Sequence, residues 1–212
     1  MSWLNLKQFL DSYKLIVKPR GILHLGANRC QEKDIYTQLV PINKVLWVEA
    51  IPSIVRDMQV ADASLRIFQG VISDIDNQDI DFYISNNDGQ SSSFLELGLH
   101  REYYPWITYV NMMELVTVTV DTFLERHMIA PHHINILVMD LQGTELLALK
   151  GANKLLPFID CIHLEVNSVE IYEGCALFYQ IEQWLDNKNF YLAHHQIEDG
   201  KVEEAFYLKK TA

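Results

Sequence analysis

Short apolar runs alternate with stretches of helical periodicity along most of the chain. The apolar runs are rich in β-branched and aromatic residues and predict strands at residues 22–25, 45–48, 65–69, 80–85, 116–120, 134–139 and 159–166. Apolar residues at helical spacing predict helices at residues 32–40, 52–61, 122–127, 145–150 and 177–187. Strands that alternate with helices in this way predict an α/β fold, doubly wound, in which helices cover both faces of a mostly parallel sheet.

The two ends of the chain add to this core. Residues 1–18 place apolar side chains at helical spacing, which predicts an N-terminal helix packed on the domain. Residues 191–195 and 205–209 flank Asp199-Gly200 and predict a C-terminal antiparallel hairpin at the edge of the sheet. No repeat, linker or low-complexity tract marks a second domain, so we expect one domain over residues 1–212.

The section at residues 86–115 interrupts the alternation of strands and helices. Asn86 to Ser93 is a polar loop, and His100 to Trp106 is dense in aromatic side chains. Mixed aromatic and polar groups suit the face of a carbohydrate, and packing in the core is the alternative role for them. We expect this section to be a loop with a short helix that acts as a lid over a ligand site.

Composition narrows the class of protein. Hydrophobic residues make up 49% of the chain and charged residues 21%, which is enough apolar material for a packed core. The formal net charge of −11 argues against nucleic acid as the main partner, because a phosphate backbone demands clustered Lys and Arg. No apolar stretch approaches the roughly 20 residues that span a bilayer, so we expect no membrane span. Cys30, Cys161 and Cys175 form no paired motif, which predicts reduced thiols and a cytoplasmic protein.

Polar residues and a glycine stand where the predicted strands end. In an open parallel sheet the ligand binds beyond the carboxyl ends of the strands, where the strand order reverses. Gly26 ends the first strand and permits a tight turn with close backbone approach to a ligand. Glu49 ends the second strand, near the spacing of about 20 residues at which an acidic residue accepts hydrogen bonds from ribose hydroxyls. Asp140 ends a later strand at the same edge, so the three residues predict one nucleoside-binding site.

The turn after the first strand discriminates between two cofactors. A dinucleotide fingerprint needs three glycines so that the helix terminus reaches a pyrophosphate, whereas Gly26-Ala27-Asn28-Arg29-Cys30 supplies one. S-adenosylmethionine has no pyrophosphate, and its sulfonium cation suits an acidic pocket. We therefore expect S-adenosylmethionine rather than NAD.

Several short motifs follow one another in a distinctive order between residues 20 and 195. They are Gly26-Ala27-Asn28, Val48-Glu49-Ala50-Ile51-Pro52, Ser91-Ser92-Ser93, Val118–Phe123, Met139–Glu145 with Leu149–Ala152, and His163–Val166. Together they resemble the FkbM family of methyltransferases. The resemblance implies a Rossmann-like fold of the class I methyltransferase type, S-adenosylmethionine as donor, and O-methylation of hydroxyls on sugars, glycans or related natural products. Two positions differ from the family pattern: His24 replaces the usual acidic residue, and Cys30 replaces a second glycine.

The strand ends assign residues to the cofactor. We expect Gly26–Asn28 at the methionine end, Glu49 on the ribose, Gly70–Ile72 near the adenine, and Ser91–Ser93 along the cofactor or the lid. The predicted cofactor-binding residues are Leu25, Gly26, Ala27, Asn28, Glu49, Ala50, Gly70, Val71, Ile72, Ser91, Ser92, Asp140 and Leu141.

Methyl transfer to a hydroxyl is an in-line displacement in which positioning supplies much of the rate, and a general base beside the hydroxyl supplies more. We assign the catalytic role to Asp140, with His100 as the second candidate; capping the helix near Thr144 is the alternative role for Asp140. Glu145 is expected to support this loop.

The spacing shows no metal-ligand motif, so no metal is expected. The predicted substrate-binding residues, facing a sugar or glycan acceptor, are His100, Tyr104, Gln142, Glu165 and Asn167.

Two other functions fit parts of the pattern. An NAD-linked sugar oxidoreductase shares the strand, turn and helix arrangement but needs the missing glycines. A non-catalytic glycan-binding domain on a degenerate methyltransferase fold is consistent with His24 and Cys30.

Overall fold

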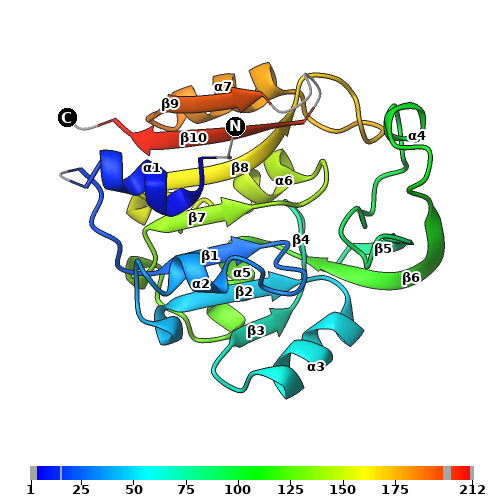
Figure 1. Cartoon of the computed structure of the whole chain (residues 1–212), viewed down its shortest axis with the longest axis horizontal. Helices are drawn as coiled ribbons and strands as arrows, with labels where there is room; N and C mark the ends of the chain where they lie inside the picture. The colour runs from blue at the N-terminus through cyan, green and yellow to red at the C-terminus, as the bar shows by residue number, and fades with distance from the viewer. Residues whose placement is uncertain (1–3, 15, 198–201, 211–212) are drawn as a thin grey trace.

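A mostly parallel sheet forms the centre of the molecule (Figure 1). The computed structural model describes residues 4–14, 16–197 and 202–210. Strands β3, β2, β1, β7 and β8 lie side by side and run parallel, whereas β10 runs antiparallel to both β8 and β9. In this order the seven strands are Arg66–Gln69, Val45–Glu49, Ile22–Leu25, Ile136–Met139, Cys161–Asn167, Val202–Lys209 and Phe190–Ile197. The predicted doubly wound class is confirmed.

The strand order reverses beside β1, which pairs with β2 on one side and with β7 on the other. The residues that follow β1, β2 and β7 therefore meet at one edge of the sheet. At the opposite margin, β10 inserts between β8 and β9, so β9 and not the last strand forms the edge. The predicted turn at Asp199-Gly200 lies outside the described residues.

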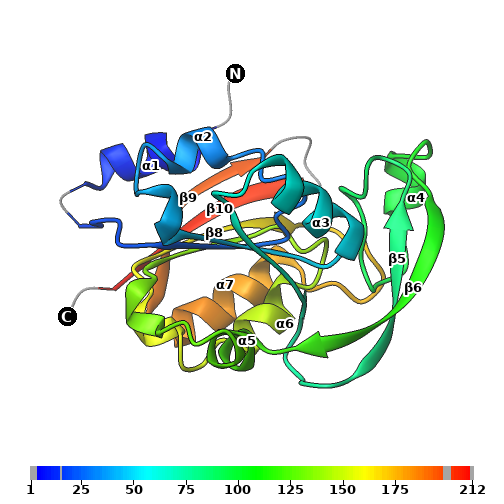
Figure 2. The same ribbon diagram turned by 90° about the horizontal axis from the view of Figure 1, so that it is seen from below.

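Helices cover both faces of the sheet, as Figure 2 shows. One face carries α1 (Leu6–Ser12), α2 (Lys33–Tyr36) and α3 (Pro52–Ala61), and the other carries α5 (Val120–Arg126), α6 (Glu145–Lys150) and α7 (Phe178–Asn187). Because both faces are covered, every residue of β1, β2 and β7 is buried. Short 3-10 helices at Ile42–Lys44, Pro131–His133 and Leu156–Phe158 precede β2, β7 and β8. No helix in the described part of the chain is long and apolar enough to cross a membrane.

Within the predicted N-terminal helix of residues 1–18, the structure has helix α1 only at Leu6–Ser12, and Trp3 and Leu15 lie outside the described residues. Asn5 and Gln8 close its first turn with a reciprocal capping box. Phe9 is buried and stacks on Phe206 of β10, with 4.4 Å between the ring centres. The helix thus closes the core above the antiparallel end of the sheet.

A small second sheet stands beyond the carboxyl ends of the parallel strands (Figure 1). In it, β6 (Tyr109–Val118) pairs with β4 (Val71–Ile72) and, antiparallel, with β5 (Asp79–Ser85). The short helix α4 (His100–Tyr103) lies between β5 and β6 in sequence. The expectation of a loop or lid throughout residues 86–115 is therefore wrong for its last part, because pairing with β5 makes Tyr109 to Leu115 a strand.

Two helix boundaries also differ from the sequence prediction. Helix α2 ends at Tyr36 rather than Val40, because the chain continues in turns. Helix α5 begins at Val120 rather than at residue 122, and Thr119 caps it: its hydroxyl accepts from the backbone N–H of Thr122 at 3.2 Å. The carboxylate of Asp121 accepts from two backbone N–H groups that follow α6, at 2.7 and 3.1 Å, and so connects α5 to that loop.

Candidate functional site

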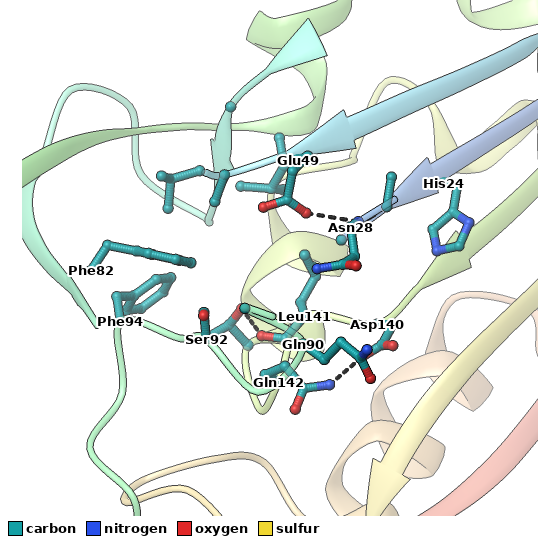
Figure 3. A pocket seen from close by; sticks show the side chains of 18 of the residues that line it. His24, Asn28, Glu49, Phe82, Gln90, Ser92, Phe94, Asp140, Leu141 and Gln142 are labelled. Atoms are coloured by element: carbon teal, nitrogen blue, oxygen red, sulfur yellow. Dashed lines mark hydrogen bonds between the residues drawn. The ribbon is translucent and has the colours of Figure 1, made fainter. Parts of the chain in front are cut away.

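A cavity of about 280 Å³ opens at the carboxyl ends of β1, β2 and β7 (Figure 3). Its walls come from the turns after these strands, from the segment after β3, and from the loop between β5 and α4. The lining residues are His24, Gly26, Ala27, Asn28, Gln31, Glu32, Glu49, Ala50, Gly70, Val71, Ile72, Phe82, Gly89, Gln90, Ser92, Phe94, Asp140, Leu141, Gln142 and Thr144.

Gly26 makes the turn after β1 possible. Its φ is +82°, and a Cβ on this residue would lie 1.8 Å from the carbonyl oxygen of Asp140. The N–H groups of Gly26 and Ala27 both donate to the carbonyl of Val48 at 2.9 Å. The turn is therefore fixed to β2 on one side and to the loop after β7 on the other.

Glu49 holds the turn and the next strand end together. One carboxylate oxygen accepts from the backbone N–H of Asn28 and the other from that of Ile51, each at 2.8 Å. The side chain is buried, which raises its pKa, and the backbone hydrogen bonds act in the opposite direction. Each oxygen keeps a further lone pair, so the carboxylate can also accept from the hydroxyls of a ribose.

The two ends of the cavity differ in polarity. Phe82 and Phe94 lie together at one end, Glu49 lies near the middle, and His24 lies at the other end (Figure 3). The aromatic end, where Val71 packs with Phe82 and Phe94, offers flat apolar faces of the kind that a purine ring packs against. The acidic, polar end offers hydrogen bonds to a charged group.

Asp140 directly follows β7 and lines the cavity. The amide of Gln142 donates to its Oδ1, and the hydroxyl of Tyr172 donates to Oε1 of the same amide at 2.5 Å. Desolvation by the surrounding protein raises the pKa of Asp140, and the hydrogen bond from Gln142 lowers it. The negative charge of Glu145 raises this pKa further. The carboxylate remains open to the cavity, so solvent limits the upward shift.

Glu145 fixes the loop that carries Asp140. Its Oε1 accepts from the backbone N–H of Leu141 at 2.8 Å and of Gly143 at 3.3 Å. Burial raises the pKa of Glu145 to about 7. The supporting role predicted for this residue is confirmed. Gln142 itself has a φ of +52°, and its carbonyl accepts from the hydroxyl of Ser93 at 2.9 Å.

A second cavity, of about 290 Å³, adjoins the first and shares Gln90, Asp140 and Gln142 with it. His100 in its wall is buried, which lowers the pKa of the imidazole and keeps the ring neutral; its Nδ1 is buried without a hydrogen-bond partner among the described residues. The lining residues are Asn87, Gln90, Ser91, His100, Tyr104, Ile107, Asp140, Gln142, Glu165, Ile171 and Tyr172.

The structure brings most of the predicted site residues together. The first cavity is lined by all predicted cofactor-binding residues except Leu25 and Ser91, and the second by all predicted substrate-binding residues except Asn167. Leu25 is wrong as a cavity residue because its side chain belongs to the core beneath the sheet. Ser91 lines the second cavity instead of the first. Asn167 lines neither, because it is fully buried where β8 meets the segment around Leu177.

Sequence reasoning missed several lining residues. Phe82 and Phe94 carried no signal beyond strand alternation and proximity to the Ser91–Ser93 loop. Tyr172 reaches Gln142 from the long segment after β8, for which the sequence predicted no element. Gln90 was identifiable, since it belongs to the same polar loop as Ser91 and Ser92. Within the described residues, no group of three or more His, Cys, Asp or Glu side chains is arranged to hold a metal ion.

A doubly wound sheet with an inserted antiparallel β10, and with a ligand cavity where the strand order reverses, is the arrangement typical of class I S-adenosylmethionine-dependent methyltransferases. The sequence matches the methyltransferase FkbM domain over residues 24–192, and the chain belongs to this family.

Similar proteins agree with this class. The 2-O-methyltransferase NoeI of Sinorhizobium fredii (strain NBRC 101917 / NGR234) is 27% identical over 180 residues, which cover 80% of this chain and 73% of that one. The magnesium protoporphyrin IX methyltransferase of Synechocystis PCC 6803, solved with bound S-adenosylmethionine, has a TM-score of 0.50 at 8% identity over 95% of this chain and 75% of that one. The Streptococcus pneumoniae protein Sp1610, which carries a provisional assignment as a tRNA (m1A22) methyltransferase, has a TM-score of 0.50 at 9% identity. The match covers 98% of this chain and 72% of that one. The two solved structures share the fold alone.

The cofactor is therefore S-adenosylmethionine, and the family assignment excludes the alternative of an NAD-linked oxidoreductase. The first cavity fits this cofactor. Its acids, Glu32, Glu49 and Asp140, suit a ligand that carries two cationic groups, and one oxygen of Glu32 is buried without a hydrogen-bond partner in the described structure. The aromatic end suits the adenine.

Replacement of Glu49 tests the placement of the ribose. Glu49→Ala is expected to weaken binding of S-adenosylhomocysteine by more than about tenfold, because hydrogen bonds to a charged group are lost. Isothermal titration calorimetry measures this affinity, and circular dichroism checks that the variant is folded. Glu114→Ala, at an exposed position of β6, is the matched control and should bind as the wild type does. Unchanged affinity in Glu49→Ala would contradict the assignment.

Proposed function

We propose that the protein is an O-methyltransferase that transfers the methyl group of S-adenosylmethionine to a hydroxyl of a sugar or glycan. The observation that supports it most is the position of Asp140, whose side chain lines both the cofactor cavity and the adjoining polar cavity. The 27% identity with a 2-O-methyltransferase supports oxygen as the acceptor atom. The aromatic and polar lining of the second cavity, with Tyr104 and Tyr172 among amides and carboxylates, supports a carbohydrate.

The residues of the chain supply positioning and a base. When bound, S-adenosylmethionine supplies an electrophilic methyl group on its sulfonium. Asp140 takes the proton of the acceptor hydroxyl while the oxygen–carbon bond forms and the carbon–sulfur bond breaks. Gln142 occupies Oδ1 of this carboxylate and so leaves Oδ2 for the acceptor. Burial lowers the pKa of His100 and raises that of Asp140, so the imidazole is the weaker base, and we assign His100 to the wall that supports the acceptor.

The raised pKa of Asp140 fixes the direction of the pH dependence. A carboxylate with a higher pKa is a stronger base, but it accepts a proton only while it is ionised. Turnover should therefore fall as the pH drops through this pKa, and should be highest above it.

Replacement of Asp140 tests the proposed base. Asp140→Asn and Asp140→Ala are each expected to lower turnover by about 100-fold or more, because general base catalysis is lost. Transfer of labelled methyl groups to a panel of methyl glycosides measures turnover, and calorimetry with S-adenosylhomocysteine should show cofactor affinity within a few-fold of the wild type. Retained turnover in Asp140→Ala would show that another group is the base. A wild-type protein that binds S-adenosylhomocysteine but methylates no glycoside would overturn the sugar assignment.

Tyr172→Phe tests the positioning of Asp140 through Gln142. Without the phenol, the amide of Gln142 loses the donor at its Oε1 and holds the ionised carboxylate less firmly. We expect the acidic limb of the pH profile of kcat/KM to move upward by about half a pH unit, because the hydrogen bond from Gln142 to the ionised form becomes weaker. Tyr179→Phe, at an exposed position of α7, is the control with no expected shift. A lower rate at every pH with an unmoved limb would indicate that Tyr172 acts only in packing.

A further inference from the structure

Three residues of the described chain line both cavities: Gln90, Asp140 and Gln142, which are labelled in Figure 3. They stand where a methyl group passes from a donor in the first cavity to an acceptor in the second. Asp140 is the proposed base. The amide of Gln142 is engaged at both ends, since it donates to Oδ1 of Asp140 and its Oε1 accepts from the hydroxyl of Tyr172. Gln90 is an exposed residue, so its amide is accessible to a ligand at this junction.

Hydrogen bonds within the loop between β5 and α4 hold Gln90 in place. The hydroxyl of Ser85 donates to Oδ1 of Asn87 at 2.6 Å and accepts from the N–H of Ser91 at 3.1 Å. The amide of Asn87 donates to the hydroxyl of Ser91 at 2.9 Å, and the N–H of Gln90 donates to the carbonyl of Asn87 at 3.2 Å. These bonds close a turn around Gln90, so the turn keeps its shape without help from a ligand.

Contacts on either side of Gln90 connect this loop to the other two loops of the site. The amide of Asn28, in the turn after β1, donates to the carbonyl of Asp88 at 3.1 Å. The hydroxyl of Ser93 donates to the carbonyl of Gln142, in the loop after β7, at 2.9 Å. The backbone of Gln90 therefore has a fixed position relative to the turn at the cofactor and to the loop of the proposed base.

An amide at this junction matches a hydroxyl group, because each of the two groups both donates and accepts a hydrogen bond. The hydroxyl that is methylated gives its proton to Asp140 and a lone pair to the methyl group. A further hydrogen bond to its oxygen would weaken the nucleophile. A hydroxyl on the next carbon of the sugar takes no part in the displacement and can bind the amide of Gln90 without this cost.

We propose that the amide of Gln90 binds the acceptor hydroxyl next to the one that is methylated, so that the enzyme selects acceptors with two neighbouring hydroxyls. This inference rests on the proposed function and narrows its substrate class. Gln90 is then an acceptor-binding residue that determines which hydroxyl stands at Asp140. Because its loop is connected to the cofactor turn, the same contact orients the sugar toward the methyl group.

Deoxy acceptors and variants of Gln90 test this contact together. The methylated position of the best methyl glycoside is identified first, and kcat/KM is then measured for this glycoside and for its analogues that lack the hydroxyl on either neighbouring carbon. For the wild type, loss of one of these hydroxyls should lower kcat/KM by about tenfold or more, because the amide is left without its partner. Gln90→Met keeps the length of the side chain and removes the amide, so its kcat/KM for the parent and deoxy glycosides should agree within about twofold.

Two controls accompany the variant. Gln183→Met, at an exposed position of α7, should discriminate between the parent and deoxy glycosides as the wild type does. Calorimetry with S-adenosylhomocysteine should show that Gln90→Met binds the cofactor product within a few-fold of the wild type.

The outcomes distinguish this inference from the proposed function. Equal use of the parent and both deoxy glycosides by the wild type, or full discrimination in Gln90→Met, would overturn the contact and leave the sugar O-methyltransferase intact. Weakening of S-adenosylhomocysteine binding by more than about tenfold, with discrimination retained, would assign Gln90 to the cofactor and would equally overturn it. No methylation of any glycoside, with normal binding of S-adenosylhomocysteine, would overturn the proposed function and this inference with it.

Discussion

The close approach of the chain after β1 to the chain after β7 is the constraint on which the site depends. Gly26 has no side chain at the point where a Cβ would meet the carbonyl of Asp140, and the N–H of Asp140 donates to the carbonyl of Leu25 at 3.0 Å. Any larger residue at Gly26 would separate the two strand ends. The same contact therefore sets both the turn that we expect at the methionine end of the cofactor and the position of the proposed base. Backbone geometry fixes the distance between these two parts of the site before any ligand binds.

The departures from the family pattern alter side chains without altering this geometry. Cys30 has a φ of +55°, a left-handed conformation that glycine adopts more readily, and its N–H donates to the carbonyl of Ala27 at 2.7 Å. The turn thus keeps the shape that a second glycine would allow. His24 replaces a charge with packing, because its ring packs against those of Tyr36 and Trp47, with centres 5.8 and 5.2 Å away, and these two rings stack on each other at 5.1 Å. The degenerate, non-catalytic alternative was motivated by these two residues, yet neither removes the cavity.

The sequence predicted the parts of the site that depend on strand order. In a parallel sheet the carboxyl ends of the strands share one edge, so Gly26, Glu49 and Asp140 could be brought together from spacing alone. The aromatic end could not be predicted in this way. Phe82 reaches the cavity because β5 pairs with a β6 that begins at Tyr109, and the sequence there, broken by Asn111 and Glu114, lacks the alternation that marks a strand. Tyr172 depends on the path of an irregular segment, and Asn167 was misplaced because the chain near Leu177 covers it.

The buried acids link the shape of the site to its chemistry. Glu49 and Glu145 each accept two backbone N–H groups, and in this way fix the turn after β1 and the loop after β7. Burial raises the pKa of both carboxyl groups. The backbone hydrogen bonds act in the opposite direction, because they stabilise the ionised form. Glu49 and Asp140 line the cavity with no Lys or Arg in the described lining, and they favour a ligand that carries a sulfonium cation. Glu49 holds the turn after β1 in place and also faces the cavity, so its replacement changes both the shape of the turn and the charge that the cofactor meets.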